Sequence, residues 1–446
     1  MLRTNIFWKD RKPHKSFFRG IAIGAAVSLA ISILSLTGFL QRWENGFFDF
    51  LVWWENEKRS NEVMIIEIDD ADYKNIFGAQ SPLSRKKISE IILKVAKSKP
   101  RVIGIDISLE DITPEDEYMI EAFQHLDQLK MPIVVPSYFS ENTEGGESIS
   151  SVVKMYPYSL PDLVFFGGIG YPTSRDGVIR EMHIEKKTNS KEICPFFPLS
   201  VLAAREGYTR KTFAKLLSSG AVGKTPGSDR DQKLGAIIKS ASHLPVQKIR
   251  YIGNKSSFSS VKSSAIFQIP EQFFESENIF SDKTIVIGGT FKESRDFYMT
   301  PKGVMSGMEI IANSIETLLS TQPLRPVNHI IEFLIEIVII FILSVFFLRF
   351  SPLKGTLISI VTIIPLAVVG SFVAFSAFSR WLNFIPAGFS IILHGQVSFY
   401  EHYRELQNEV KMLKDALSDK TRKISRLKNT GAAGQHLLEK KRKEVK

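Results

Sequence analysis

The chain has 446 residues, a formal net charge of +10 and a mean hydropathy of +0.01. This hydropathy averages several membrane-length apolar runs with one long polar stretch, a distribution that excludes an ordinary soluble protein. The positive charge does not require a nucleic-acid partner, because basic residues that flank membrane segments account for most of it.

The N-terminal segment predicts a membrane anchor. Residues 1–19 carry six basic side chains and one acidic one, and residues 20–40 form an uncharged apolar run that predicts transmembrane helix 1. The alternative is a cleaved signal peptide. Its apolar core is normally shorter, however, and a small-x-small cleavage site would follow it, whereas this sequence continues Leu40-Gln41-Arg42-Trp43. We therefore expect a retained anchor with a basic cytoplasmic N-terminus.

Residues 41–327 predict a nearly neutral extracytoplasmic domain. Short β-branched runs alternate with segments of helical periodicity, which predicts an α/β fold with a mainly parallel or mixed sheet and helices on both faces. The only cysteine, Cys194, excludes an internal disulfide, and its apolar context indicates a buried, unreactive thiol. In chain order, the first predicted elements are Val63–Ile68, Arg85–Ser98, Val102–Ile107, Glu115–Leu129 and Pro132–Val135.

The second half of the domain is less regular. Asp176-Gly177 predicts a turn between short strands, and residues 200–206 predict a helix. Residues 218–245 are rich in Ser, Gly and Lys and predict an exposed loop. A strand at 284–287 and a helix at 306–319 repeat the pattern of the start of the domain.

Three further apolar runs predict transmembrane helices at 328–349, 355–378 and 382–400. Basic residues at both ends of the chain place both termini in the cytoplasm and the large domain outside. Four crossings are consistent with that orientation. We therefore expect a multi-pass membrane protein that contacts lipid through these runs.

Three polar side chains, Glu332, Glu336 and His394, lie inside the predicted spans. Charge in lipid is costly, so we expect them to face other helices or water. Glu336 is the deeper of the two acids, with His394 or Gln396 as expected partners. Structural hydrogen bonding is favoured here over a path for ions or protons.

The segment 401–430 predicts a cytoplasmic coiled coil continuous with the fourth span. Lys420 interrupts its apolar seam, Gly431 to Gly434 are expected to end the helix, and 431–446 to form a flexible basic tail. The alternative is a single amphipathic helix on the anionic inner leaflet. The coiled coil predicts a homo-oligomer through a seam of Leu406, Val410, Leu413, Leu417, Ile424 and Leu427.

Several motifs, in this order, give the chain its resemblance to a known family. They are Ile66-Glu67-Ile68-Asp69-Asp70, Pro82 with Arg85, Val102 to Asp106, Asp176 to Arg180, residues 283–290, Asp296, Thr300-Pro301 and Gly307 to Asn313. The chain resembles the type-2 CHASE domain, a sensory extracellular domain of bacterial cyclases and histidine kinases. The similarity covers roughly residues 45–400, because the family typically continues into three transmembrane helices. One departure is Gln80 to Arg85, where the family usually has a Trp-Pro segment.

The resemblance implies a sensory module in a bacterial inner (plasma) membrane, with a periplasmic input domain. Family members commonly continue into a cytoplasmic cyclase or kinase, and no such motif fits in the 46 residues after Tyr400. We therefore expect no enzymatic activity and a separate effector chain that binds the tail.

The candidate site follows from the topology. Ligands of open α/β sheets bind at the carboxyl ends of strands, where several polar residues and glycines fall. The alternative is structural: the acids cap turns or bind backbone amides, and Arg85 pairs with Asp296. No catalytic or cofactor motif is present, and the oxygen ligands are too few to predict a metal. The candidate ligand-binding residues are Asp69, Asp70, Arg85, Asp106, Gly288, Gly289, Asp296 and Thr300.

Three functions are compatible with these features. We favour a sensor or scaffold whose periplasmic domain binds a small ligand or a protein and signals through the membrane helices to the coiled coil. The second is a structural component of an oligomeric membrane assembly without ligand sensing. The third is an exported enzyme that uses the Asp residues.

Overall fold

The computed structural model describes residues 13–144, 147–153, 160–187, 193–219, 234–239, 246–320, 324–350 and 352–444. The chain divides into two compact units. The helical unit comprises Met1–Asn45, Val327–Ser371 and Leu382–Lys446, and the α/β unit comprises Gly46–Pro326 and Phe372–Trp381.

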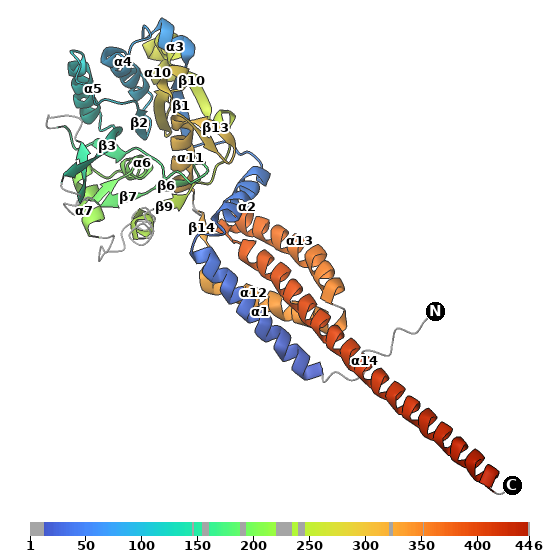
Figure 1. Ribbon diagram of the computed structural model, residues 1–446. Coiled ribbons are helices and arrows are strands. Elements are labelled where there is room, and N and C mark those ends of the chain that lie inside the picture. The colour runs from blue at the N-terminus through green and yellow to red at the C-terminus, as the bar shows by residue number, and fades with distance from the viewer. Residues whose placement is uncertain are drawn as a thin grey trace. The chain divides into compact units, whose positions relative to one another are not determined.

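A seven-stranded sheet forms the centre of the α/β unit (Figure 1). Its strand order is β10-β1-β11-β2-β3-β4, and β5 also pairs with β3. All pairs are parallel except β3 with β4. The strands are β1 (Val63–Ile68), β2 (Val102–Asp106), β3 (Ile133–Glu144), β4 (Glu147–Val153), β5 (Val164–Gly168), β10 (Ser259–Lys262) and β11 (Thr284–Gly289).

Successive side chains of each strand enter cores on opposite faces of the sheet, as the two-residue period of a strand requires. Ile65 lies in one core and Ile66 in the other, and both are fully buried. The first core is covered by α2 (Gln41–Trp54), α6 (Phe197–Arg205), α7 (Arg210–Ser218) and α11 (Gly307–Leu319). The second is covered by α3 (Asp70–Asn75), α4 (Arg85–Ala96), α5 (Asp116–Gln128), α9 (Ser263–Gln268) and α10 (Glu271–Ser276).

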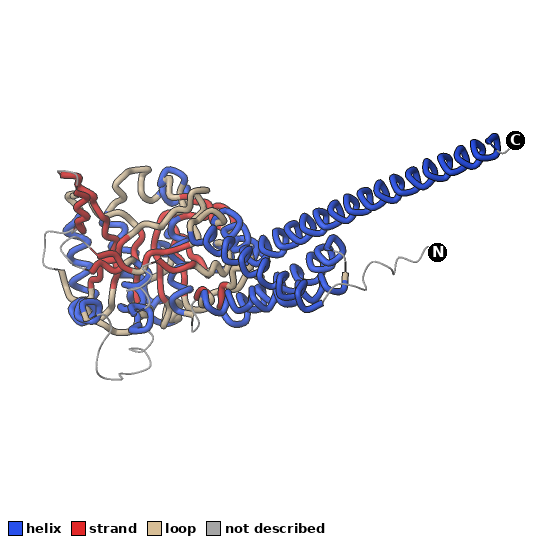
Figure 2. The backbone as a smooth tube through the Cα atoms, turned by 60° about the horizontal axis from the view of Figure 1, so that its bottom comes forward, coloured by secondary structure: helices blue, strands red, loops and turns tan. Residues whose placement is uncertain are grey.

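The α/β fold with a parallel sheet and helices is therefore confirmed (Figure 2). The β-branched runs form strands because Ile and Val pack well on a pleated surface. Helix α4 begins where the Ser84 side chain accepts a hydrogen bond from the Lys87 amide, and its apolar stripe faces the sheet. Burying each such Ile or Val contributes about 2 kcal/mol.

Smaller paired strands complete the α/β unit. The pairs are β6 (Glu181–His183) with β9 (Val246–Lys248), β7 (Glu185–Lys187) with β8 (Ile193–Pro195), β12 (Phe297–Thr300) with β13 (Gly303–Ser306), and β14 (Arg325–Pro326) with β15 (Arg380–Trp381). Short 3₁₀ turns, η1 (Lys255–Ser257) and η2 (Lys292–Ser294), lie between them. Most of the predicted loop at 218–245 lies outside the described residues, and 234–239 are helical.

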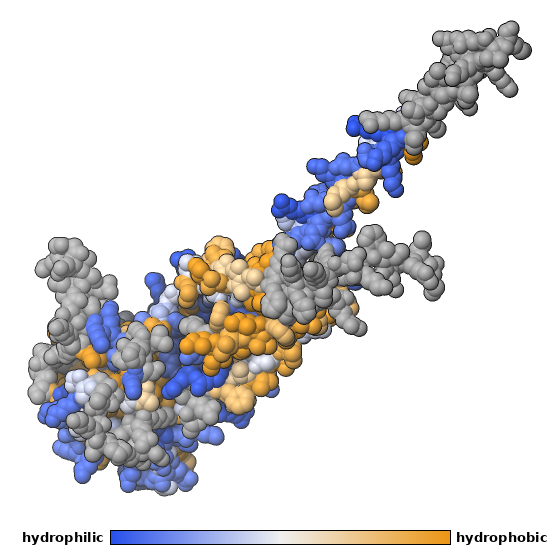
Figure 3. Space-filling model, turned by 90° about the horizontal axis from the view of Figure 1, so that it is seen from below, coloured by the Kyte–Doolittle hydropathy of each residue, from blue (hydrophilic) through white to orange (hydrophobic). Residues whose placement is uncertain are grey.

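The helical unit contains α1 (Pro13–Leu36), the start of α2, α12 (His329–Arg349), most of α13 (Pro352–Phe378) and α14 (Ile385–Glu444). Helix α1 lies against α12 and α14. Apolar side chains gather on the surface of these helices, and polar ones on the described tail of α14 (Figure 3). Leu36, Ile330 and Val361 are among the most exposed apolar residues.

Four membrane spans are not confirmed. Within the described residues, only Lys354–Phe378 is long and apolar enough on its own, and the bent pair Ile21–Leu36 with Gln41–Trp54 would add a second if it forms one span. The apolar start of α14, Ile385 to Tyr400, is shorter than the about 20 residues that a span needs. The structure therefore supports at least one span.

Two boundaries differ from those predicted. Residues 372–381, expected to end the third span and connect it to the fourth, belong to the α/β unit because Phe375 and Trp381 are buried in its first core. Helix α14 does not end at Gly431 to Gly434 but continues to Glu444. A glycine within a helix costs only about 1 kcal/mol, and helix-forming residues follow on its C-terminal side.

The polar residues predicted inside the membrane do not pair as expected. Glu336 accepts hydrogen bonds from Ser28 and, at 3.5 Å, from Ser32, both on α1, and not from His394 or Gln396. Glu332 accepts a hydrogen bond of 3.3 Å from the Asn383 amide. His394 is buried close to Gly24 of α1. The serine hydroxyls are nearer because α1 packs against both α12 and α14.

Candidate functional site at the carboxyl edge of the sheet

The parallel strands bring several predicted residues to one edge of the sheet. Asp69 follows β1, Asp106 ends β2, and Gly288 and Gly289 end β11, which lies between them. Gly288 is directly opposite Asp106 on one side and Glu67 on the other. These residues therefore lie at one common edge of the sheet.

Asp69 and Asp70 make structural contacts there. The Asp69 carboxylate caps α3 by accepting a 2.8 Å bond from the Asp72 amide and forms a 2.8 Å ion pair with Lys262. Although burial works against the charge, Lys262 and the backbone amides hold the pKa of Asp69 below its usual value. Asp70 accepts a 2.8 Å bond from the Lys292 amide. Both carboxylates therefore fix neighbouring backbone, as the structural alternative proposes.

Arg85 is fully buried and does not pair with Asp296, contrary to the structural alternative. Its guanidinium donates to the carbonyls of Ser108, at 3.0 Å, and Asp111, at 3.4 Å, and lies 3.5 Å from an Asp116 carboxylate oxygen on α5. Because α4 packs beside α5, the side chain points into that face of the unit. Arg85 therefore fixes the loop that follows β2.

Thr300 closes the turn between β12 and β13. Its hydroxyl donates to the Gly303 carbonyl, at 2.7 Å, and accepts from the Lys302 amide, at 3.2 Å. The side chain is 4% exposed and is engaged within its own hairpin. Thr300 thus stabilises the turn between β12 and β13.

Asp106 and Asp296 lie close together and interact unfavourably. Burial raises the pKa of Asp106 to about 8, and the charge of Asp296 adds to this effect. Burial also raises the pKa of Asp296, while hydrogen bonds from Tyr298 and Gly307 oppose the rise. In the described part of the chain, no Lys or Arg neutralises either carboxyl group. The pair therefore favours a bound proton or an external positive group.

Three tyrosines complete what we call the acid–tyrosine cluster: Asp106, Asp296, Tyr138, Tyr171 and Tyr298. Tyr138 comes from β3, Tyr171 follows β5, and Tyr298 comes from β12. Burial, followed by the two carboxylates, raises the pKa of Tyr298 to about 12, and burial with the charge of Asp106 raises the pKa of the other two. The phenols therefore stay protonated. Tyr298 donates a hydrogen bond to Asp296, while Tyr138 and Tyr171 share hydrogen bonds with Ser108 and Ser314.

Two glycines allow this close approach. A Cβ atom at Gly307, the first residue of α11, would overlap the Asp296 carboxylate. A Cβ atom at Gly288 would lie 2.9 Å from the Met308 Sδ and 3.2 Å from the Asp106 Cβ. Side chains at either position would displace the acids, so both glycines shape the cluster. The arrangement can hold a proton or accept hydrogen bonds from a cationic ligand.

Comparison with known families decides the identity. The model of the CHASE2 domain matches residues 25–348. The chain belongs to the CHASE2 domain family. The resemblance inferred from the motifs is confirmed, and these domains are extracellular sensory domains of membrane proteins. Searches among curated proteins and among solved structures find no match.

One motif of the CHASE2 domain, Asp176 to Arg180, forms a tight turn whose arginine secures α2. Gly177 has a φ of +78°, a conformation that glycine adopts without strain. Arg180 is nearly buried and donates paired bonds to Asp49 of α2, at 2.7 and 2.6 Å, and to Asp176, at 2.9 and 2.8 Å. The sequence predicted the turn, but Asp49 lies too far away in the chain to be recognised.

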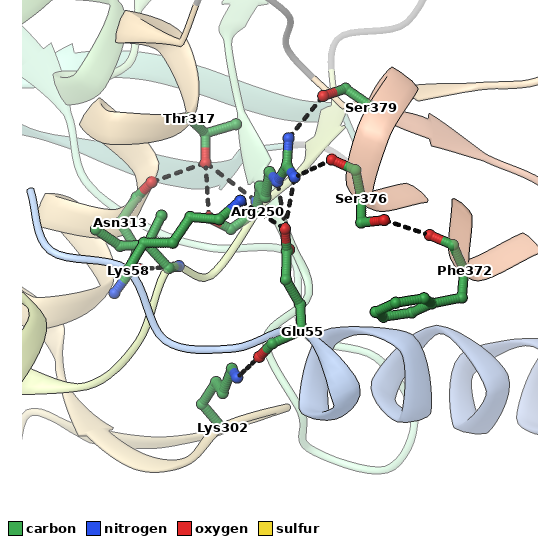
Figure 4. Close-up of polar contacts among 10 residues, drawn as sticks. Glu55, Lys58, Arg250, Lys302, Asn313, Thr317, Phe372, Ser376 and Ser379 are labelled. Atoms are coloured by element: carbon green, nitrogen blue, oxygen red, sulfur yellow. Dashed lines mark hydrogen bonds and ion pairs between the residues drawn. The ribbon is translucent and has the colours of Figure 1, made fainter. Parts of the chain in front are cut away.

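A second arginine of the CHASE2 domain joins three elements (Figure 4). Arg250 follows β9 and binds Glu55 just after α2, with bonds of 2.6 and 3.4 Å. The same guanidinium donates to the Ser379 hydroxyl at 2.6 Å and the Ser376 carbonyl at 3.0 Å, at the end of α13. We call Arg250, Glu55, Ser376 and Ser379 the Arg250 junction.

Charge complementarity stabilises the Arg250 junction. The side chains of Arg250 and Glu55 are only 12% and 9% exposed. Although burial opposes ionisation, Arg250 and Lys58 hold the pKa of Glu55 below its usual value. Sequence reasoning missed this site because its members are far apart in the chain and belong to no motif.

Proposed function

We propose that this protein is a sensor of the bacterial inner membrane whose CHASE2 domain receives a ligand or partner protein at the acid–tyrosine cluster. The supporting observation is a pair of acids without a basic partner in the described chain, at the edge of a parallel sheet where ligands of such sheets bind. In this proposal the protein performs no catalysis itself. It signals through its helices to an effector in another chain.

The proposed topology has four spans, with the CHASE2 domain in the periplasm and both termini in the cytoplasm. The exposed apolar side chains of α1, α12 and α13 support burial of these helices in lipid. The basic residues at 1–19 and after residue 400 support the orientation. The apolar start of α14 would supply the fourth crossing.

The tail of α14 is proposed to pair with a second copy in a parallel coiled coil. Five of the six seam residues are described there, and Leu406, Val410, Leu413, Leu417 and Ile424 are 44 to 67% exposed. The side chain of Leu427 lies outside the described residues. In a parallel pair, Glu409 of one helix faces Lys414 of the other, which favours this register.

Replacing both Leu413 and Leu417 with Asp is expected to convert a dimer of the full chain in lipid nanodiscs into monomers. Two charges in the seam remove its apolar contacts and repel their equivalents in the second copy. Mass photometry would measure the change. Met412→Asp is the matched control, because Met412 is 64% exposed but lies outside the seam. A monomeric unsubstituted chain would refute the proposed pairing.

Signalling from the acid–tyrosine cluster to the tail can be tested with Leu413→Cys, which places a thiol in the seam while the native Cys194 stays buried. Oxidation in membranes should give a disulfide-linked dimer. We expect Asp106→Asn or Asp296→Asn in this background to change the yield at least about fivefold, a change typical of allosteric coupling. An unchanged yield of disulfide-linked dimer, in variants that fold, would contradict signalling from the cluster to the tail.

A structural assembly component is the second candidate. It is favoured by the structural contacts of Asp69, Asp70, Arg85 and Thr300, which leave fewer predicted residues for a ligand. This candidate predicts the same dimer as the sensor. It also predicts a cross-linking yield that does not respond to substitutions in the acid–tyrosine cluster, so the preceding experiment separates the two.

A further inference from the structure

Helix α11 begins at the acid–tyrosine cluster. Its first residue, Gly307, lies against the Asp296 carboxylate, and its amide donates a 2.9 Å bond to the Asp296 carbonyl. The next residue, Met308, packs on Gly288 beside Asp106. About two turns further, Ser314 shares a hydrogen bond with Tyr171. Helix α11 therefore lies against Asp296, packs beside Asp106 and contacts the phenol of Tyr171.

The second half of α11 holds the segment that carries Arg250. The Asn313 side chain accepts a 2.9 Å bond from the Ile252 amide and donates a 3.1 Å bond to the Gly253 carbonyl. The Thr317 hydroxyl accepts a 3.0 Å bond from the Arg250 amide. Both side chains are at least 98% buried. Figure 4 shows them beside Arg250, so a movement of α11 must displace this segment or break buried hydrogen bonds.

Arg250 then continues the connection to the helix ends. The backbone of Arg250 is held by α11, while its side chain binds Glu55 after α2 and the last turn of α13. Lys302 adds a 2.7 Å bond to the Glu55 carbonyl. The Arg250 side chain cannot follow a displaced α11 without changing its contacts with both helix ends.

We infer that α11 is the connecting element through which a change at the acid–tyrosine cluster reaches the ends of α2 and α13. This inference rests on the proposed function of the cluster as the receiving site. It assigns Asn313, Thr317 and Arg250 as coupling residues that contact no ligand. Coupling of this kind acts equally in both directions, so a change at the Arg250 junction must also alter the cluster.

The test is hydrogen exchange of the full chain in nanodiscs, followed by mass spectrometry. Asp296→Asn changes the cluster end of α11, and Tyr298→Phe does so without altering a carboxylate. We expect exchange at least about fivefold faster at 250–253 and 372–381 in both variants, as well as near Gly307. Asp282→Asn is the matched control, because Asp282 is a 78% exposed acid of the same unit that pairs only with Arg101 among the described residues.

The reverse experiment uses Glu55→Gln, which weakens the Arg250 junction. Faster exchange at 286–290 and 296–308 is expected. Thr317→Val should weaken the effect of each substitution at the opposite end of α11, because it removes part of the side-chain bonding that joins α11 to residues 250–253. Exchange that changes only locally in all variants would overturn the inference. The cross-linking of the tail is read independently, so failure of the α11 connection and failure of the sensor proposal are distinguishable.

Discussion

Replacing Asp106 with Asn is expected to stabilise the α/β unit at pH 8 and to change its stability little at pH 4. The folded state holds a proton on Asp106 up to a pKa of about 8, whereas the unfolded chain releases it near pH 4. Stability is therefore lost as the pH rises through this window, and Asn, which has no proton to lose, avoids the loss. The difference of about four pKa units sets an upper limit of about 5 kcal/mol.

Urea unfolding of the full chain in detergent, followed by circular dichroism at pH 4, 6 and 8, measures this effect. The informative quantity is the difference between variant and unsubstituted chain at each pH, because Asp69 and other acids contribute the opposite trend. The groups that face Asp106 are Asp296 and the phenols of Tyr138, Tyr171 and Tyr298. A difference that does not vary with pH would show that Asp106 is ionised in the folded domain.

Replacing Arg180 with Met is expected to destabilise the α/β unit by about 3 kcal/mol. The substitution leaves Asp49 and Asp176 without their shared cation and removes four hydrogen bonds. Removing one partner of a buried ion pair costs about 3 to 5 kcal/mol, and the partial exposure of the two acids favours the lower value. The loss also frees α2 from the turn, so exchange of α2 amides should accelerate.

Arg101→Met is the matched control for this substitution. Arg101 also pairs with an aspartate, Asp282, but at 3.3 Å and with 43% of its side chain exposed, so its loss should cost less than about 1 kcal/mol. Arg180→Lys should fall between the two, because a lysine keeps the charge but not the forked geometry. Equal effects of Arg180→Met and Arg101→Met would contradict the role of Arg180 in securing α2.

The sequence was sufficient to predict the parallel sheet and the common edge of Asp69, Asp106 and Gly288. Those features follow from local periodicity and from the parallel order of the strands, which both act over short stretches of chain. The amphipathic helix α2 was not predicted from the sequence. Its buried face, Phe48, Leu51 and Val52, is apparent only against the completed core.

The side-chain contacts that form the acid–tyrosine cluster and the Arg250 junction were less predictable from the sequence. Tyr138 and Tyr171 have no motif, and only tertiary packing brings them to Asp106 and Asp296. The structural alternative paired Arg85 with Asp296, but α4 directs Arg85 toward α5. The same limit applies to Arg250, whose partners are separated from it by more than a hundred residues in the chain.

Helix α14 is one uninterrupted helix of 60 residues, so its length is roughly 90 Å at 1.5 Å per residue. An intact helix of this kind carries rotation and axial displacement along its length, since each residue is hydrogen-bonded to the next turn. Binding of an effector to the tail would then depend on the rotational orientation of the helix. Adding or removing one residue between the apolar start and the seam would rotate the surface of the tail by about 100° relative to the apolar start.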